Sequence, residues 1–131
     1  MTKVFVDNIE KLTKENENFR KVIFTSSHSQ LVVMTIQPGD DIGEEVHELD
    51  QFIRIEEGEA KAVLDDVEYE MKDDFAVVIP VGVKHNIINT GDKPLKLYSI
   101  YSPAEHRHDV IHATKEEAEA DNEEFDGVTS L

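Results

Sequence analysis

The hydrophobic positions of this chain fall into short runs that predict β-strands from residue 21 onwards. Eight runs rich in β-branched and aromatic residues cover residues 21–25, 31–37, 52–56, 59–64, 67–71, 75–79, 85–89 and 95–101. Turn-forming residues separate them, as in segments 38–41 and 80–82. Short strands at this spacing, with no long helical pattern between them, are typical of an all-β sandwich or barrel.

Helical patterns flank this β-rich region. Residues 7–17 predict a short helix with Asp7 as its N-cap, and residues 115–122 predict a second short helix behind Thr114. The last residues, 126–131, are expected to be frayed.

We therefore interpret residues 1–131 as a single domain. Its barrel core covers about residues 20–101, and a C-terminal tail follows over residues 102–131.

The net charge of −16 at pH 7 limits the possible partners. Nucleic acid is excluded as an expected partner because binding it requires a basic face, and anionic membranes are disfavoured by the same repulsion. Much of the acidity lies in residues 114–126, so the net charge says little about the field inside a pocket.

The chain has no cysteine, which excludes disulfides, thiolate catalysis and zinc–thiolate sites. The N-terminal residues lack an apolar signal-like segment, and the sequence has no apolar run of about 18 residues that could span a membrane. We expect a cytoplasmic protein.

Four side chains carry the candidate chemistry. Glu45 and His47 are two residues apart, so they project from the same face of an extended segment, and Gln51 keeps this parity. His85 begins a separate predicted strand behind a Pro-x-Gly turn. Inward-facing nitrogen and oxygen donors on neighbouring strands predict a site for one divalent metal.

The donor types narrow the metal to Zn, Fe, Mn, Ni or Co. Two imidazoles, a carboxylate and an amide oxygen suit these ions, and two histidines with one carboxylate also match non-haem iron oxygenases. Four protein ligands leave about two positions of an octahedral ion open for a substrate. Alternatively, Gln51 hydrogen-bonds to one of the metal-binding residues and does not itself bind the metal.

These segments resemble the two sequence motifs of the cupin superfamily. The positions that match both motifs in type and spacing are Gly39, His47, Gly58, Pro80, Gly82, His85 and Asn89. Glu45 stands where the motif has a histidine, Gln51 where it has a glutamate, and Asp74 where it has a glycine. The resemblance implies an antiparallel β-barrel, or jelly roll, with short terminal helices that binds a small molecule, and it implies a homodimer.

A closer resemblance is to small bacterial cupins of the mannose-6-phosphate isomerase-like kind. It is carried by segments 45–47, 50–52, 54–58 and 100–106. It implies a metal-dependent isomerase or lyase acting on a small sugar or hydroxy-carbonyl compound. Two alternatives stay open: a non-haem Fe(II) dioxygenase and a non-catalytic small-molecule binder.

An isomerase needs a separate base, and the sequence assigns no catalytic residue with certainty. Tyr101, Lys84 and His106 are weak candidates. The tail histidines His106, His108 and His112 could form a second metal cluster or a lid, but a solvated surface is favoured for them.

The remaining notable side chains have ordinary roles. Arg54 is expected to face away from the pocket and pair with an acid, and Lys84 to be solvated. Residues predicted to form the core or the pocket wall are Phe52, Ile53, Ile55, Phe75, Ile79 and Ile87.

Overall fold

The computed structural model describes residues 3–131 of the chain. The helices are α1 (Ile9–Glu15) and α2 (Lys115–Ala120). The strands are β1 (Arg20–Thr25), β2 (Gln30–Ile36), β3 (Asp50–Glu57), β4 (Ala60–Leu64), β5 (Val67–Met71), β6 (Ala76–Ile79), β7 (His85–Asn89), β8 (Leu95–Ser102) and β9 (Ile111–His112).

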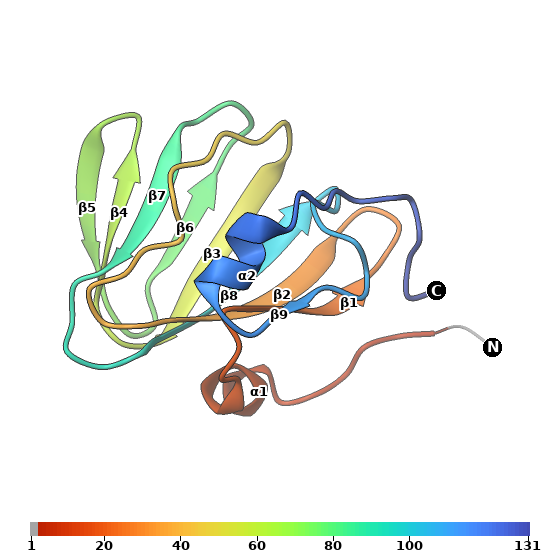
Figure 1. Ribbon diagram of the computed structural model, residues 1–131, viewed down its shortest axis with the longest axis horizontal. Coiled ribbons are helices and arrows are strands. Elements are labelled where there is room, and N and C mark those ends of the chain that lie inside the picture. The colour runs from red at the N-terminus through yellow and green to blue at the C-terminus, as the bar shows by residue number, and fades with distance from the viewer. Residues whose placement is uncertain (1–2) are drawn as a thin grey trace.

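The strands form two antiparallel sheets that share one core. The larger sheet has the order β6-β3-β8-β2-β1-β9 and the smaller one β5-β4-β7 (Figure 1). Buried residues from both sheets, among them Met34 and Ile53 of the larger and Ala62 and Ile87 of the smaller, belong to one cluster. The predicted all-β jelly roll with two short helices is confirmed.

Strand register decides which side chains face this interior. Gln30, Tyr101, Gln51 and Ile79 are successive partners across β2, β8, β3 and β6, and all four are buried. Because paired residues project from the same face of a sheet, this row forms one layer of the barrel interior.

The helix starts differ slightly from the prediction. Asn8, and not Asp7, caps α1, because its side chain accepts a hydrogen bond from the backbone of Lys11. Thr114 caps α2 as expected. No helix among residues 3–131 is both long and apolar enough to cross a membrane.

Two of the aromatic residues predicted for the core or the pocket wall lie outside the core. Phe75 is 44% exposed, and Phe52 is half-buried against Tyr98 on the outer face of the larger sheet. The four isoleucines predicted for the core are buried. Arg54 faces outward and pairs with Glu56 and Asp74, as expected.

The tail is more ordered than predicted. Residues Ile111 and His112 form the short strand β9 on the edge of β1. Near the C-terminus, Ser130 exchanges hydrogen bonds with Thr25 through its backbone and its hydroxyl, so residues 126–131 are not simply frayed.

Candidate functional site

Glu45 and His85 are held together by the backbone. Each donates its N–H to the carbonyl of the other, at 2.8 and 2.9 Å, so Glu45 forms an isolated bridge on β7. The Glu45 side chain is 30% exposed, whereas that of Glu44 is 64% exposed and faces Lys84. The expectation that Glu44 faces outward is therefore confirmed.

Glu45 and His47 form an ion pair at the wall of the barrel. Oε2 of Glu45 lies 3.1 Å from Nε2 of His47, which has no partner in hydrogen-bonding geometry. Two donor atoms bound side by side to one octahedral ion, each at about 2.1 Å, are separated by about 3.0 Å. This spacing suits a shared metal.

His85 lies beside His47, with ring centroids 5.1 Å apart. Its Nδ1 is 3.0 Å from the carbonyl of Val83, which assigns the proton to Nδ1 and leaves Nε2 as the atom with a free lone pair. A metal-binding histidine commonly holds its second nitrogen against a carbonyl in this way.

Gln51 presents an unpartnered oxygen to the interior. Its Nε2 donates to the hydroxyl of Ser99 at 3.3 Å, but its buried Oε1 has no hydrogen-bond partner. A buried acceptor without a donor costs about 1–3 kcal/mol, which a bound cation would offset.

Within residues 3–131, no three His, Cys, Asp or Glu side chains converge closely enough to hold a metal ion. The donor chemistry and the unpartnered atoms fit a divalent ion, but the ligands are not gathered around one point.

Electrostatics couple Glu45 to His47. Burial acts to raise the pKa of Glu45, but the facing imidazole outweighs it and the pKa of this carboxyl lies below its ordinary value. Burial acts to lower the pKa of His47, but Glu45 and Glu105 outweigh it and raise this pKa. Oε1 of Glu105, a residue of the tail, is 3.5 Å from Nδ1 of His47. The His47 ring therefore faces a carboxylate on each of its two nitrogens.

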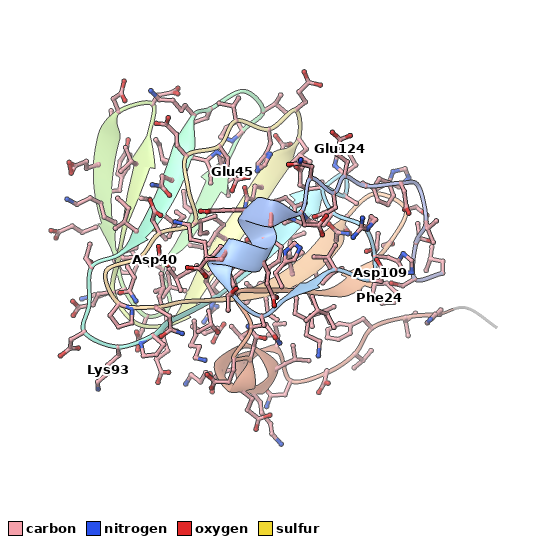
Figure 2. All side chains as sticks on the ribbon, in the orientation of Figure 1. Phe24, Asp40, Glu45, Lys93, Asp109 and Glu124 are labelled. Carbon is pink, nitrogen blue, oxygen red and sulfur yellow. The ribbon has the colours of Figure 1, made fainter. Side chains whose placement is uncertain are left out.

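The tail histidines are less exposed than predicted, and His108 is half-buried. His106 and His112 are only 6% and 5% exposed, because the tail folds back over one end of the barrel. Figure 2 shows Glu124 of the tail at the same end of the barrel as Glu45. His106 packs edge-on against Tyr101, whose ring also meets that of His47.

Glu123 orients His106. Its Oε1 lies 2.5 Å from Nδ1 of His106, while Nε2 of His106 is buried without a partner. Burial lowers the pKa of His106 despite the charge of Glu123. Because Nδ1 donates to Glu123, the free Nε2 of the neutral ring is the atom that can accept a proton. Among the other base candidates, Lys84 pairs with Asp66 at the surface, and burial raises the pKa of Tyr101 far above its usual range.

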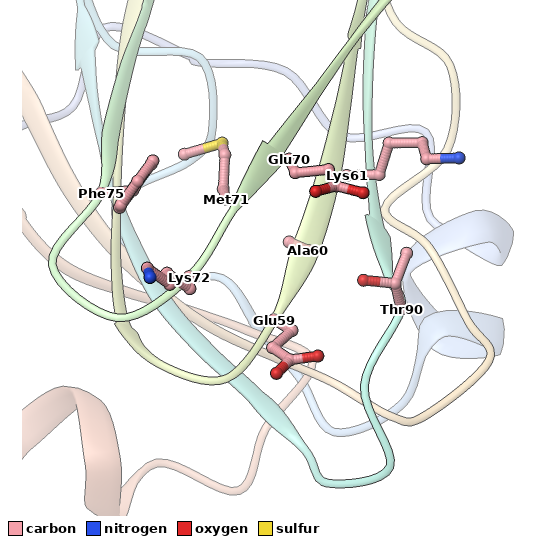
Figure 3. Close-up of a pocket in the computed structure, with 8 residues that line it drawn as sticks. All are labelled: Glu59, Ala60, Lys61, Glu70, Met71, Lys72, Phe75 and Thr90. Carbon is pink, nitrogen blue, oxygen red and sulfur yellow. The ribbon is translucent and has the colours of Figure 1, made fainter.

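A separate hollow of about 600 Å³ lies beside β4 and β5, away from these donors (Figure 3). It is lined by Glu59, Ala60, Lys61, Glu70, Met71, Lys72, Phe75 and Thr90. Its polar side chains are mostly exposed lysines and glutamates, and the candidate chemistry lies inside the barrel.

Comparison with known proteins identifies the family. Residues 32–101 match the Cupin domain family. YrkC of Bacillus subtilis (strain 168), an uncharacterised protein, is 44% identical over 125 residues, which are 90% of this chain and 67% of YrkC. The uncharacterised protein L612 of Acanthamoeba polyphaga mimivirus is 44% identical over 108 residues, covering 79% of this chain and 68% of L612.

A solved structure agrees over nearly the whole chain. The crystal structure of BH2720 from Bacillus halodurans matches with a TM-score of 0.89 and 46% identity, and covers 91% of this chain and 96% of BH2720. The resemblance to the mannose-6-phosphate isomerase-like kind stays a prediction. Since the family match spans more than half of the chain and carries the predicted fold, this chain belongs to the cupin family.

Proposed function

We propose that this cupin binds one divalent transition metal through Glu45, His47, Gln51 and His85. We propose further that it is an isomerase or lyase for a small sugar or hydroxy-carbonyl compound, as in the mannose-6-phosphate isomerase-like kind. The unpartnered Oε1 of Gln51 and the 3.1 Å spacing between Glu45 and His47 support the ligand set. When bound, a divalent ion supplies a Lewis acid that polarises substrate oxygens.

The observation that carries the choice of reaction class is the His106–Glu123 pair. Isomerisation next to a carbonyl requires a group that removes and returns a proton. His106 has the features of such a base, because Glu123 fixes its Nδ1 and its buried Nε2 is free. Dioxygen chemistry needs no such base, so this pair favours an isomerase or lyase over the dioxygenase.

The other residues have supporting roles in this proposal. Tyr101 lies between His106 and His47 and stays protonated, so its phenol is a donor for a substrate oxygen. Glu105 faces Nδ1 of His47 and would hold that imidazole in position. The tail over the barrel end would limit access of water to the reacting atoms.

The first experiment is elemental analysis of tag-free protein, beside His47→Ala and His85→Ala. The exposed His28→Ala is the matched control, because it removes a histidine outside the site. We expect near-stoichiometric metal in wild type and in the control, and loss in both site variants. Wild type that carries no metal and takes none up on reconstitution contradicts the metal proposal.

Activity then separates the reaction classes. We expect the metal-loaded protein to interconvert aldose and ketose phosphates, and His106→Asn to lower kcat while retaining the metal. Iron in the wild type together with oxygen uptake on catechols or flavonols would favour the dioxygenase. A co-purifying metabolite that is bound but never converted would favour the binder.

We also propose a cytoplasmic homodimer. Apolar side chains on the outer face of the larger sheet support self-association, since Val78 is 66% exposed and is the register partner of Phe52. Sedimentation analysis of wild type and Val78→Glu tests this. We expect a dimer that the charge weakens, whereas a monomeric wild type would contradict the proposal.

A further inference from the structure

A buried arginine shares the barrel interior with the candidate metal ligands. Arg20 begins β1, and its partner in the register is Met34, which in turn pairs with Leu97. Both of these residues are fully buried, so the Arg20 side chain projects from the same inward face. The residue is only 8% exposed.

No acidic side chain among residues 3–131 forms an ion pair with Arg20, and its buried Nε has no hydrogen-bond partner. Its contacts are the Phe19 ring, 5.3 Å from the guanidinium carbon, and Nδ1 of His112, 3.5 Å from Nη1. A guanidinium is always charged and presents five donors in a planar fork. Such a group, buried without a carboxylate, is costly unless a ligand pairs with it.

The charge of Arg20 reaches the candidate base pair. Burial is the main cause of the lowered pKa of His106, and the positive charge of Arg20 adds to it; the same charge adds to the effect of His106 in lowering the pKa of Glu123. Arg20 is the positive group inside the barrel that could attract an anion.

The neighbour His112 holds Arg20 without neutralising it. Nε2 of His112 lies 3.1 Å from Oδ2 of Asp121, which assigns the proton to Nε2 and leaves Nδ1 as an acceptor facing Arg20. Asp121 therefore orients the imidazole, and the imidazole orients one edge of the guanidinium. The Nε edge is left for another acceptor.

We propose that Arg20 binds an oxyanion, the carboxylate or phosphate group of the substrate, inside the barrel. The inference deepens the proposed function, on which it rests for where the remainder of the substrate lies. It restricts the substrate to an anionic sugar or hydroxy-carbonyl compound, such as a sugar acid or a sugar phosphate. Planar bidentate recognition of carboxylate and phosphate is the role for which arginine is better suited than lysine.

The test measures anion binding to metal-free protein, so that it does not depend on turnover. Inorganic phosphate and malonate are titrated separately against wild type, and Tm is followed at ionic strength held constant with chloride. We expect a saturable rise in Tm with at least one anion, because a ligand that binds only the folded state stabilises it. The anion that saturates at the lower concentration identifies the phosphate or the carboxylate as the natural group.

Three variants decide the assignment. Arg20→Gln should weaken the apparent affinity by about tenfold or more, and Arg20→Lys by less, since it keeps the charge but loses the fork. Lys21→Gln, the matched control, removes the same charge from the exposed next residue of β1 and should bind anions like wild type. Equal Tm shifts in wild type and Arg20→Gln, or no saturable shift in wild type, overturn the inference.

Further variants distinguish anion binding by Arg20 from the metal proposal and from a purely structural role of Arg20. His47→Ala should lose metal yet keep the anion response, so a failure of the metal proposal is distinguishable from a failure of this one. If Arg20→Gln does not fold, Arg20→Lys carries the test, and an unchanged anion affinity in that variant counts against the arginine fork. A purely structural Arg20 would lower Tm on substitution with no change in anion affinity.

Discussion

Glu123 accepts a hydrogen bond from His106, 17 residues earlier in the chain. This bond links two distant parts of the tail, residues 102–131. The carboxylate also accepts the backbone N–H of Arg107 at 3.1 Å, so both of its oxygens are used. Burial acts to raise the pKa of Glu123, but the His106 imidazole and this backbone bond outweigh it and lower the pKa. The pair therefore links the stability of the tail to pH.

The first prediction follows from the two pKa directions. The native pKa of His106 lies below the ordinary value of 6.5, so below pH 6.5 the unfolded chain binds this proton first and the free energy of unfolding falls. The native pKa of Glu123 lies below 4.5, so a second loss begins below pH 4.5. We expect His106→Asn to remove the loss below pH 6.5 and Glu123→Gln the one below pH 4.5, measured by urea unfolding across pH.

The controls for this prediction are the exposed His28→Asn and Glu124→Gln, which should leave the pH profile unchanged (Figure 2 labels Glu124). The contribution of His47 to the free energy of unfolding changes with pH in the opposite direction. Its pKa is raised in the folded state, so the stability it contributes is lost as the pH rises through that native pKa. The profiles are therefore compared as differences between wild type and variant. A His106→Asn profile parallel to wild type between pH 6.5 and 5 would contradict the prediction.

Two buried glutamines provide a matched test of the metal site. Gln51 loses only its bond to Ser99 on substitution, so Gln51→Leu should change the free energy of unfolding of the metal-free protein by about 1 kcal/mol or less. Its metal affinity should fall by about tenfold or more. Isothermal titration with Zn²⁺ and urea unfolding measure the two quantities.

Gln30 is the control for Gln51. Its side chain bonds to Thr25 and to the backbone of Glu105 and His106, so Gln30→Leu leaves several buried groups unpaired. We expect this variant to lose about 3 kcal/mol or more of stability. Equal stability losses in Gln51→Leu and Gln30→Leu would mean that Gln51 is an ordinary structural amide.

The third prediction concerns two motif glycines with positive φ. A Cβ on Gly58, at φ +118°, would lie 3.1 Å from Cδ1 and 3.3 Å from Cα of Leu95, whereas a Cβ on Gly39, at φ +79°, meets nothing within 4 Å. Gly39→Ala should cost about 1 kcal/mol from its backbone conformation, and Gly58→Ala about 3 kcal/mol because the clash adds to it. Thermal unfolding that ranks the two variants in the reverse order would contradict this explanation.

The fourth prediction assigns a structural role to the motif residue Asn89. Its amide donates to the carbonyls of Ile36 and Lys93, and its oxygen accepts the N–H of Gly91. Asn89→Leu should lower the free energy of unfolding by about 3 kcal/mol, because the carbonyl of Ile36 is left buried and unpaired. The exposed neighbour Thr90→Ala should cost less than about 0.5 kcal/mol in the same urea titration.

The strands were predictable because local pattern and turn residues specify them. The boundaries 67–71 and 85–89 agree with β5 and β7 at both ends. β9 was missed because two residues carry no periodic signal, and its pairing depends on Arg20 and Lys21, some ninety positions earlier in the chain. Phe75 was misassigned because alternation alone does not tell whether the facing surface is covered.

The site was predictable only where it lies on motifs. Parity selected Glu45 over Glu44, but no sequence signal indicated that Glu105 and Glu123 would face the histidines. An acidic stretch predicts a solvated segment. The Glu123 side chain is buried only because the tail returns to the barrel. Arg20 was missed because the predicted strand began one residue later, although its alternation with the buried Val22 was a usable signal.

The residues of the site divide at the borders of the matched family segment. Glu45, His47, Gln51 and His85 lie within residues 32–101, whereas Arg20, Glu105, His106 and Glu123 lie outside it. If the proposed roles of these flanking residues hold, changes in β1 and the tail would alter the choice of substrate and the transfer of protons while the shared barrel stays intact. Two cupins that agree over the barrel alone need not share a reaction, and classifying this one requires comparison of β1 and the tail.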